Sequence, residues 1–370
     1  MSPLSGCCWH LQRCIGPSDG VDDYKDDFLC HRDVAHNGVG VFSVALVQAN
    51  EPLEDHSQLR IGSFGTLIGI YDGHGGPEAS EFISRCLFSK IETFAERFGE
   101  MSCRVLKEAF KATEDEFLTV VDENWHIRPQ IASVGSCCLV GVISGSNLYI
   151  ANVGDSRVVL GTGKRGRVGA VRLSEDHNAA VAEVRDELKA QHPDDSNIVV
   201  LKHGVWRVKG IIQVSRSIGD LYLKKPEFKR EVVSRFGMPL ILKRPVLSAE
   251  PALYERVLIA EDRFLIFASD GLWDQITDQE ACKFVQRNPQ IGIARKLVQV
   301  ALERAAKKRE MRYSVMREIE PGVRRYFHDD ISVIVVHLDP KLCGVPFQWG
   351  HGPLIGLPNA FIDIFSSNNL

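Results

Sequence analysis

The apolar residues of the chain recur with two different periods, and these predict a series of strands and helices. Short apolar runs rich in β-branched and aromatic residues predict strands. These runs lie at residues 39–50, 64–73, 136–163, 211–215, 263–271 and 329–339. Apolar residues spaced three and four positions apart predict helices instead. One helix starts at Pro77, and the others cover residues 103–121, 177–191, 278–286 and 293–308.

The order of these segments favours antiparallel sheets. Between residues 136 and 163 three strands follow one another through short turns, and Ser144–Asn147 supplies the turn residues of a hairpin. Hairpins join antiparallel neighbours, whereas every parallel pair needs a longer crossover connection. We therefore predict an α+β fold, with a central β-sandwich of two antiparallel sheets flanked by α-helices. A doubly wound α/β fold is the alternative.

The chain is predicted to hold one large domain with a segment of different character at each end. Residues 1–38 contain an acidic patch and no clear period, so we interpret them as an N-terminal extension. The periodic segments fall within residues 39–340, the main domain. Residues 341–370 are rich in Gly and Pro, which predicts an irregular C-terminal tail.

Charge and hydropathy exclude several classes of protein. The 370 residues include 44 Lys and Arg against 48 Asp and Glu, a net charge of −4. Without a basic excess, no nucleic-acid partner is expected. No apolar run approaches the roughly 20 residues that a membrane span requires. We expect an intracellular protein, in the cytoplasm, the nucleus or both.

The ten cysteines do not form a metal-binding pattern. No two of them have the CxxC spacing typical of zinc sites. We expect mostly structural, reduced thiols, and Cys137 and Cys138 lie in the apolar run SVGSCCLVGV, where buried thiols are common. Cys7 and Cys8 are a weaker candidate for acylation, which would hold the protein at the periphery of the plasma membrane.

Acidic residues recur where predicted strands end, and they are the candidate chemistry of the chain. The positions are Glu54, Asp55, Asp72, Asp155, Asp270, Asp274, Asp329 and Asp330. Any one Asp-Gly dipeptide is more often a simple turn. Several carboxylates gathered at one end of a sheet would repel one another unless cations compensated them. Oxygen ligands without a Cys or His cluster favour Mg²⁺ or Mn²⁺ over zinc or copper.

Five motifs in this order resemble the metal-dependent protein phosphatases of the PP2C type. They are YDGHGG, NVGDSR, VSRSIGD, FASDGLWD and HDDISVIVV, and the resemblance covers about residues 39–340. The stretches QANEPLEDHSQ and AAKKREMRYS are further similar to the plant clade D group of that family. The resemblance implies the β-sandwich described above, with a two-metal centre at one end.

The resemblance also implies roles for individual residues. Asp72, Asp270 and Asp329 would bind Mg²⁺ or Mn²⁺ directly, together with the carbonyl of Gly73. Glu54 would hold metal-bound water with Asp55 beside it, and Asp155 and Asp274 match residues that bind a third, weaker metal ion. A water bridging two cations would attack the phosphorus. His74, two residues after Asp72, is our candidate for the acid that protonates the leaving oxygen.

One position departs from the family pattern. The family commonly has an arginine four residues before Glu54, where it grips the substrate phosphate, and this chain has Asn50. We therefore keep two hypotheses open. The first is a phosphoserine/phosphothreonine protein phosphatase, and the second is a catalytically impaired scaffold of the same fold that binds phosphoproteins.

The partners follow from the resemblance alone. They are phosphorylated protein substrates, with a plasma-membrane proton pump as one candidate and small auxin-induced proteins as candidate inhibitors. We expect the protein to be a monomer.

Overall fold

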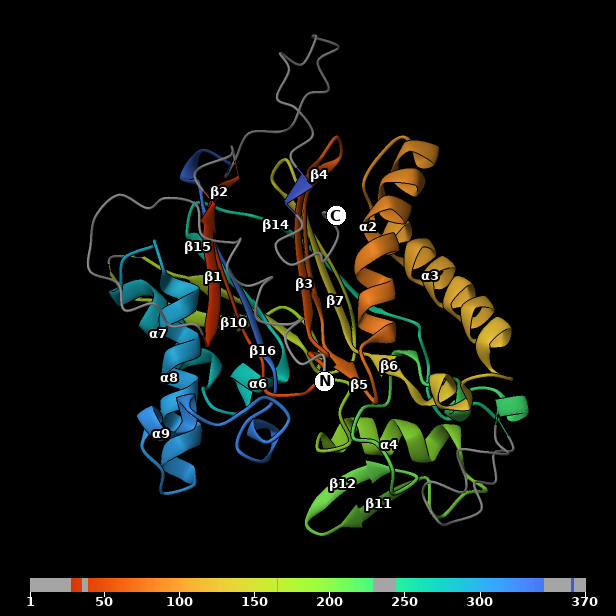
Figure 1. The fold of residues 1–370 in the computed structure, drawn as a ribbon. Coiled ribbons are helices and arrows are strands. Elements are labelled where there is room, and N and C mark those ends of the chain that lie inside the picture. Colours follow the sequence, from red (N-terminus) through yellow and green to blue (C-terminus); the bar gives the residue numbers. More distant parts are fainter. Residues whose placement is uncertain (1–27, 35–38, 165, 229–243, 343–360, 363–370) are drawn as a thin grey trace, which may run out of the picture.

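Two antiparallel sheets lie face to face at the centre of the molecule (Figure 1). The computed structural model describes residues 28–34, 39–164, 166–228, 244–342 and 361–362. The first sheet has the spatial order β1 (Leu29–Val34), β2 (Gly40–Val47), β16 (Ile331–Leu338), β15 (Asp262–Ala268), β9 (Arg157–Thr162) and β10 (Gly169–Arg172). The second has the order β14 (Ala252–Val257), β8 (Asn147–Val153), β7 (Cys138–Ser144), β4 (Gly65–Tyr71), β3 (His56–Gly62) and β17 (Phe361–Ile362).

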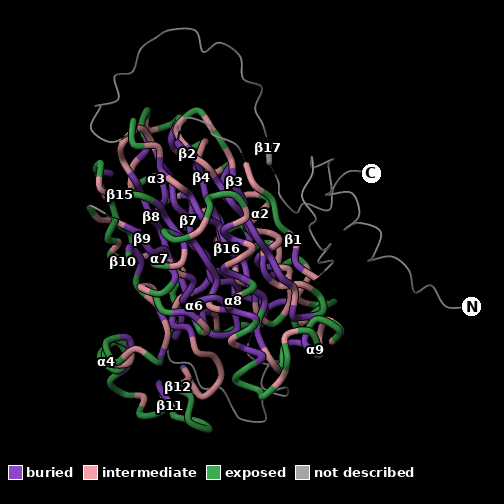
Figure 2. The backbone as a smooth tube through the Cα atoms, turned by 90° about the vertical axis from the view of Figure 1, so that its left-hand side faces the viewer, coloured by how far each residue is buried: buried purple, intermediate pink, exposed green. Residues whose placement is uncertain are grey.

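Alternation along the strands divides the core into layers, because successive side chains of a strand point to opposite faces. Val44 of β2 and Ile68 of β4 pack between the two sheets, where they join Phe267 of β15. Their chain neighbours Ala45 and Leu67 face outward and are also buried, under the helices. A register slip of one residue would therefore exchange two apolar faces. Figure 2 shows both sheets as buried through most of their length.

Helices cover the outer face of each sheet. The second sheet is covered by α2 (Glu78–Phe98) and α3 (Cys103–Asn124), and the first by α6 (Asp270–Trp273), α7 (Asp278–Arg287), α8 (Ile293–Lys308) and α9 (Tyr313–Arg317) (Figure 1). Their ends have local causes. Gly99 ends α2 in the left-handed conformation with φ of 78°. Thr277 and Glu280 form a capping box at the start of α7.

Smaller elements gather beyond one end of the sandwich. A three-stranded sheet contains β13 (Ile218–Gly219), β6 (Gly135–Ser136) and β5 (Gly73–His74). The helix α4 (Ala182–Gln191) and the hairpin of β11 (Val199–Lys202) and β12 (Val205–Val208) project beyond it (Figure 1). The short 3-10 helices are η2 (Pro129–Ser133), η3 (Leu221–Leu223), η4 (Pro226–Phe228), η5 (Arg324–Tyr326) and η6 (Pro340–Leu342).

The predicted fold class is confirmed. Every strand pair within the two large sheets is antiparallel, so the doubly wound alternative is wrong. The predicted strand at 211–215 is also wrong, since this segment makes only isolated bridges. The helix predicted at 177–191 begins only at Ala182, because the preceding residues bond to the 213–215 segment.

Two strands occur outside the region of regular pattern. The strand β1 lies in the segment expected to be an extension, and it pairs with β2 from Leu29 to Val34. The strand β17 lies in the expected tail and pairs with β3. Residues 1–27 and 343–360, with Cys7 and Cys8, lie outside the described residues. No helix in the described ranges is long and apolar enough to cross a membrane.

Candidate metal and phosphatase site

The pairing of the strands brings the predicted acidic residues to one end of the sandwich. Val47 of β2 pairs with Ile331 of β16, so the loop that follows β2 meets the residues just before β16. Ala268 of β15 pairs with Arg157 of β9, so the end of β15 lies beside the start of β9. Asp72 follows β4, Asp155 lies between β8 and β9, Asp270 begins α6, and Asp329 precedes β16. All four therefore converge at the end where β5, β6 and α6 lie (Figure 1).

Asp72 and Asp270 are each surrounded by other acidic side chains. Burial, followed by the charges of Asp55, Asp270, Asp329 and Asp155, raises the pKa of Asp72 well above its usual value. Burial, with Asp155 as the first of its charged neighbours, does the same to the pKa of Asp270. Within the described ranges, neither side chain has an ion pair with a Lys or Arg.

This environment fits a hard divalent cation. Buried carboxylates stay charged at neutral pH only when a cation or strong donors compensate them. Protein donors are scarce here, and the available ligand atoms are oxygens, which suit Mg²⁺ and Mn²⁺. The residues present therefore fit the metal ions that the sequence predicted.

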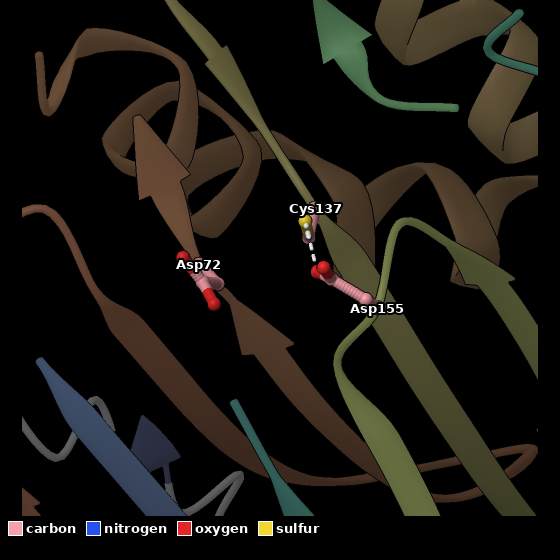
Figure 3. A group of neighbouring side chains, drawn as sticks. All are labelled: Asp72, Cys137 and Asp155. Carbon is pink, nitrogen blue, oxygen red and sulfur yellow. Dashed lines mark hydrogen bonds between the residues drawn. The ribbon is translucent and has the colours of Figure 1, made fainter. Parts of the chain in front are cut away.

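A group of three side chains marks the centre of this region (Figure 3). Ligand atoms of Asp72, Cys137 and Asp155 lie within 4.8 Å of one another. The Cys137 thiol donates to Asp155 Oδ1 over 3.2 Å, and the Asn178 amide donates to Asp155 Oδ2 over 2.6 Å. Burial raises the pKa of Asp155, although both hydrogen bonds oppose the shift. Burial also raises the pKa of the Cys137 thiol well above its usual value, which agrees with its role as a hydrogen-bond donor to Asp155.

Asp330 holds the loop that carries Glu54 and Asp55. Its two carboxylate oxygens accept the backbone N–H groups of Ala49 (2.5 Å), Asn50 (2.9 Å), Glu54 (2.9 Å) and Asp55 (3.3 Å). The first two bonds go to Oδ1 and the others to Oδ2. One buried carboxylate thus closes the loop on both sides of its tip.

Within this loop, the predicted acidic residues differ in their surroundings. Asp55 is buried and accepts a hydrogen bond from Ser269 Oγ at 2.8 Å. Burial raises the pKa of Asp55 well above its usual value, with Asp330 as the next cause. Burial and then Asp330 also raise the pKa of Glu54, while the positive charge of Arg325 acts in the opposite direction.

Asn50 contacts a predicted metal ligand. Its Nδ2 donates to Asp329 Oδ1 over 2.8 Å, and its side chain is almost completely buried. The amide therefore orients Asp329 and does not extend into solvent.

The backbone at Gly73 passes too close to its neighbours for any other residue. A Cβ at this position would lie 2.5 Å from the Glu54 carbonyl oxygen and 2.7 Å from Ser80 Oγ. The Gly73 N–H also donates to the Glu54 carbonyl at 3.2 Å. This contact locks the turn after Asp72 against the loop that holds Glu54.

His74 is oriented by a buried aspartate that the sequence analysis missed. Its Nε2 lies 2.7 Å from Asp220 Oδ2, which also accepts a hydrogen bond from Ser217 Oγ at 2.6 Å. Burial lowers the pKa of His74, but the adjacent Asp220 outweighs this effect, and the net pKa is raised. Gly135 makes room for the pair, because a Cβ there would overlap both side chains.

Asp274 lies at the outer margin of the acidic cluster. Burial and the charge of Asp155 raise its pKa, and Lys308 opposes them. The Lys308 ammonium donates to the Asp274 carbonyl oxygen at 2.9 Å. Asp274 thus has a compensating cation beside it, unlike Asp72 and Asp270.

The structure brings together every residue that the sequence placed in the site. Asp220, Cys137, Asn178 and the clamp role of Asp330 were not foreseen. Asp220 lies in VSRSIGD, a motif noticed only for its resemblance, so the signal was present without a role attached. Cys137 was predicted to be a structural thiol, but it borders the acidic cluster.

Comparisons with known proteins agree with this geometry. A family profile described as "Protein phosphatase 2C" matches residues 55–309. Probable protein phosphatase 2C 46 of Arabidopsis thaliana is 53% identical over 350 residues, which cover 92% of this chain and 92% of that protein. Probable protein phosphatase 2C 78 of Oryza sativa subsp. japonica is 53% identical over 363 residues, covering 97% and 93%.

Solved structures support the fold independently. The serine-threonine phosphatase 2C from Toxoplasma gondii superposes with a TM-score of 0.61 at 16% identity, covering 84% of this chain and 99% of that one. The acidic cluster at the end of the sandwich, the profile match and the plant relatives lead to one conclusion. The chain belongs to the protein phosphatase 2C family, and it is a protein serine/threonine phosphatase.

Proposed function

We propose that the chain hydrolyses phosphoserine and phosphothreonine at a centre of two Mg²⁺ or Mn²⁺ ions. The ligands would be Asp72, Asp270, Asp329 and the Gly73 carbonyl, with Glu54 holding water at the centre. A third, weaker ion would bind between Asp155 and Asp274. The observation that carries this proposal is the gathering of carboxylates around Asp72 and Asp270, which within the described residues have no ion pair with a Lys or Arg.

Bound divalent ions would supply an activated water and would neutralise phosphoryl oxygens. The rest of the mechanism belongs to the protein. His74 would protonate the leaving seryl or threonyl oxygen, and because Asp220 engages Nε2, the donating atom would be Nδ1. Asp220 would hold the ring in place and favour its protonated form. Asp330 would keep Glu54 and Asp55 in position through the four backbone bonds of the loop.

The decisive assay measures phosphate release from a phosphothreonine peptide in Mn²⁺, in Mg²⁺ and in EDTA. The wild-type protein is compared with Asp72→Asn and with the control Asp186→Asn, an exposed residue of α4. We expect release that depends on metal, is lost in Asp72→Asn and is unchanged in Asp186→Asn. Release that persists in EDTA would contradict the metal mechanism.

A second candidate is a scaffold that binds phosphoproteins without turnover, and Asn50 is the observation in its favour. A neutral amide stands where the family has an arginine. The charge-assisted contact of that arginine to phosphate would be worth about 1.5–3 kcal/mol. Folded protein that binds Mn²⁺ and retains a phosphopeptide, yet releases no phosphate, would support this candidate against the first.

The cellular context stays a prediction from the resemblance. We propose clade D membership, a monomer in the cytoplasm or nucleus, and action near the plasma membrane on a phosphorylated proton pump. Small auxin-induced proteins are the proposed inhibitors. Co-purification from plant membranes and light scattering of the pure protein would test these points.

A further inference from the structure

Position 50 leaves the substrate phosphate without its usual cation. The Asn50 side chain is 3% exposed, and its Nδ2 is committed to Asp329 Oδ1 at 2.8 Å. Its backbone N–H is bound to Asp330. The residue is neutral and almost completely buried, so it offers a phosphoryl group no charge, and its amide is bonded to Asp329.

The segment just before Asp329 is fixed against this same loop. The N–H of Gly322 donates to the Ala49 carbonyl at 2.7 Å, and Arg324 Nη1 donates to the Gln48 carbonyl at 2.9 Å. The Arg324 guanidinium is buried and lies 4.1 Å from the centre of the Phe28 ring. These contacts hold the short helix η5 beside the start of the Glu54 loop.

Arg325 is the next residue of η5, and its side chain differs from that of Arg324 in exposure and in hydrogen bonding. Its side chain is exposed, and within the described residues it forms no hydrogen bond or ion pair. Its chain neighbour Arg324 is bonded to the Gln48 carbonyl, so the backbone of Arg325 is held beside the start of the loop that carries Glu54. Arg325 is therefore an uncommitted guanidinium near the acidic centre.

Two other cations near the acidic cluster are committed elsewhere. Arg157 forms ion pairs with Asp176 at 2.5 Å and with Asp278 at 2.6 Å. Lys308 is bonded to the Asp274 carbonyl, on the side of the cluster where Asp274 and Asp155 lie. Of the three, Arg325 alone stands on the Glu54 and Asn50 side with its donors available.

We propose that Arg325 binds the phosphoryl group of the substrate and supplies the charge that Asn50 lacks. A guanidinium presents a planar fork of N–H donors that matches two phosphate oxygens at once. The long side chain stands on a helical turn that is fixed beside the start of the loop that carries Glu54. This inference rests on the phosphatase activity, and it names the residue that recognises the phosphate.

The test uses the full-length protein loaded with Mn²⁺ and the variants Arg325→Ala and Arg325→Lys. The control is Arg309→Ala, an exposed arginine at the end of α8. The measurements are KM and kcat for a phosphothreonine peptide and for p-nitrophenyl phosphate, and the Kd of inorganic phosphate by calorimetry. Thermal melting of each variant establishes that it folds.

We expect Arg325→Ala to raise KM for both substrates and the Kd of phosphate by about 10- to 100-fold, with a smaller change in kcat. Arg325→Lys keeps the charge but not the fork, and it should fall between Ala and wild type. Arg309→Ala should match wild type.

Two results would overturn the inference. One is a Kd of phosphate and a KM for both substrates that stay within about twofold of wild type in Arg325→Ala. The other is a defect confined to the peptide, which would mean that Arg325 reads the protein around the phosphate. A wild-type protein that binds phosphate but does not turn over would count against the proposed mechanism, while the calorimetry would still decide on Arg325.

Discussion

Replacing Asp72 by asparagine should stabilise the metal-free protein, although it removes a predicted metal ligand. Ligand atoms of Asp72 and Asp155 lie within 4.8 Å of each other. Two unit charges at that separation repel by about 1 kcal/mol in water and by about 3 kcal/mol at an effective dielectric constant of about 20. Within the described residues the Asp72 carboxylate accepts no hydrogen bond that the substitution would remove, and the new amide can donate to its neighbours. We therefore expect a gain of about 1–3 kcal/mol in the free energy of unfolding.

The pH dependence has a definite sign. Because the folded pKa of Asp72 is raised, the folded wild-type protein binds more protons than the unfolded chain above about pH 4. The stability of the metal-free protein therefore falls as pH rises from about 4 to that raised pKa. The advantage of Asp72→Asn should therefore be larger at pH 8 than at pH 5, because the raised pKa leaves more of wild-type Asp72 protonated at the lower pH.

The assay is urea unfolding in EDTA at pH 8 and pH 5, repeated with Mn²⁺. The order of stability should reverse with metal, because ligand binding stabilises only the protein that retains its site. Asp186→Asn, an exposed change on α4, should stay within about 0.5 kcal/mol of wild type. If Asp72→Asn were less stable than wild type by more than about 1 kcal/mol in EDTA at pH 8, the electrostatic reasoning would be refuted.

Three further predictions concern the supports of the site. Asp330→Ala leaves four backbone N–H groups without their acceptor, so it should lower the free energy of unfolding by at least about 3 kcal/mol. A loss below about 1 kcal/mol would contradict the role of Asp330 in holding the Glu54 loop. Asp220→Asn should lower the pKa of His74 in metal-free protein, because the carboxylate that raises this pKa is removed. An unchanged NMR titration of His74 would refute the pairing. With less imidazolium present, the alkaline limb of kcat should move to lower pH. Gly135→Ala should reduce kcat at least about tenfold, because the new Cβ displaces His74 from Asp220. The control Gly169→Ala, whose Cβ would meet no atom closer than 3.8 Å, should leave kcat unchanged. Equal kcat values in the two variants would show that the His74–Asp220 pair is dispensable.

Local patterns predicted much of the fold because they report local physics. The helices α2, α3, α7 and α8 and most central strands lie where periodicity placed them, since each element buries one apolar face. The failures share a cause. The segment 211–215 has strand composition, but its backbone bonds to the nearby Val208 and to His177 and Ala179, and a local window does not contain the last two. The strands β1 and β17 form only through partners supplied by β2 and β3.

The candidate site likewise has features that the local sequence predicts and features that only the fold creates. The sequence by itself determined which carboxylates could bind metal, because acidic residues at the ends of apolar strands are costly without cations. It also determined the family, through five motifs in fixed order. Only the tertiary structure decided how neighbouring residues differ: Asp329 meets Asn50 while Asp330 clamps a loop, and Arg324 is buried while Arg325 is exposed. Adjacent residues share their local sequence, so only contacts made across the fold can give them different roles.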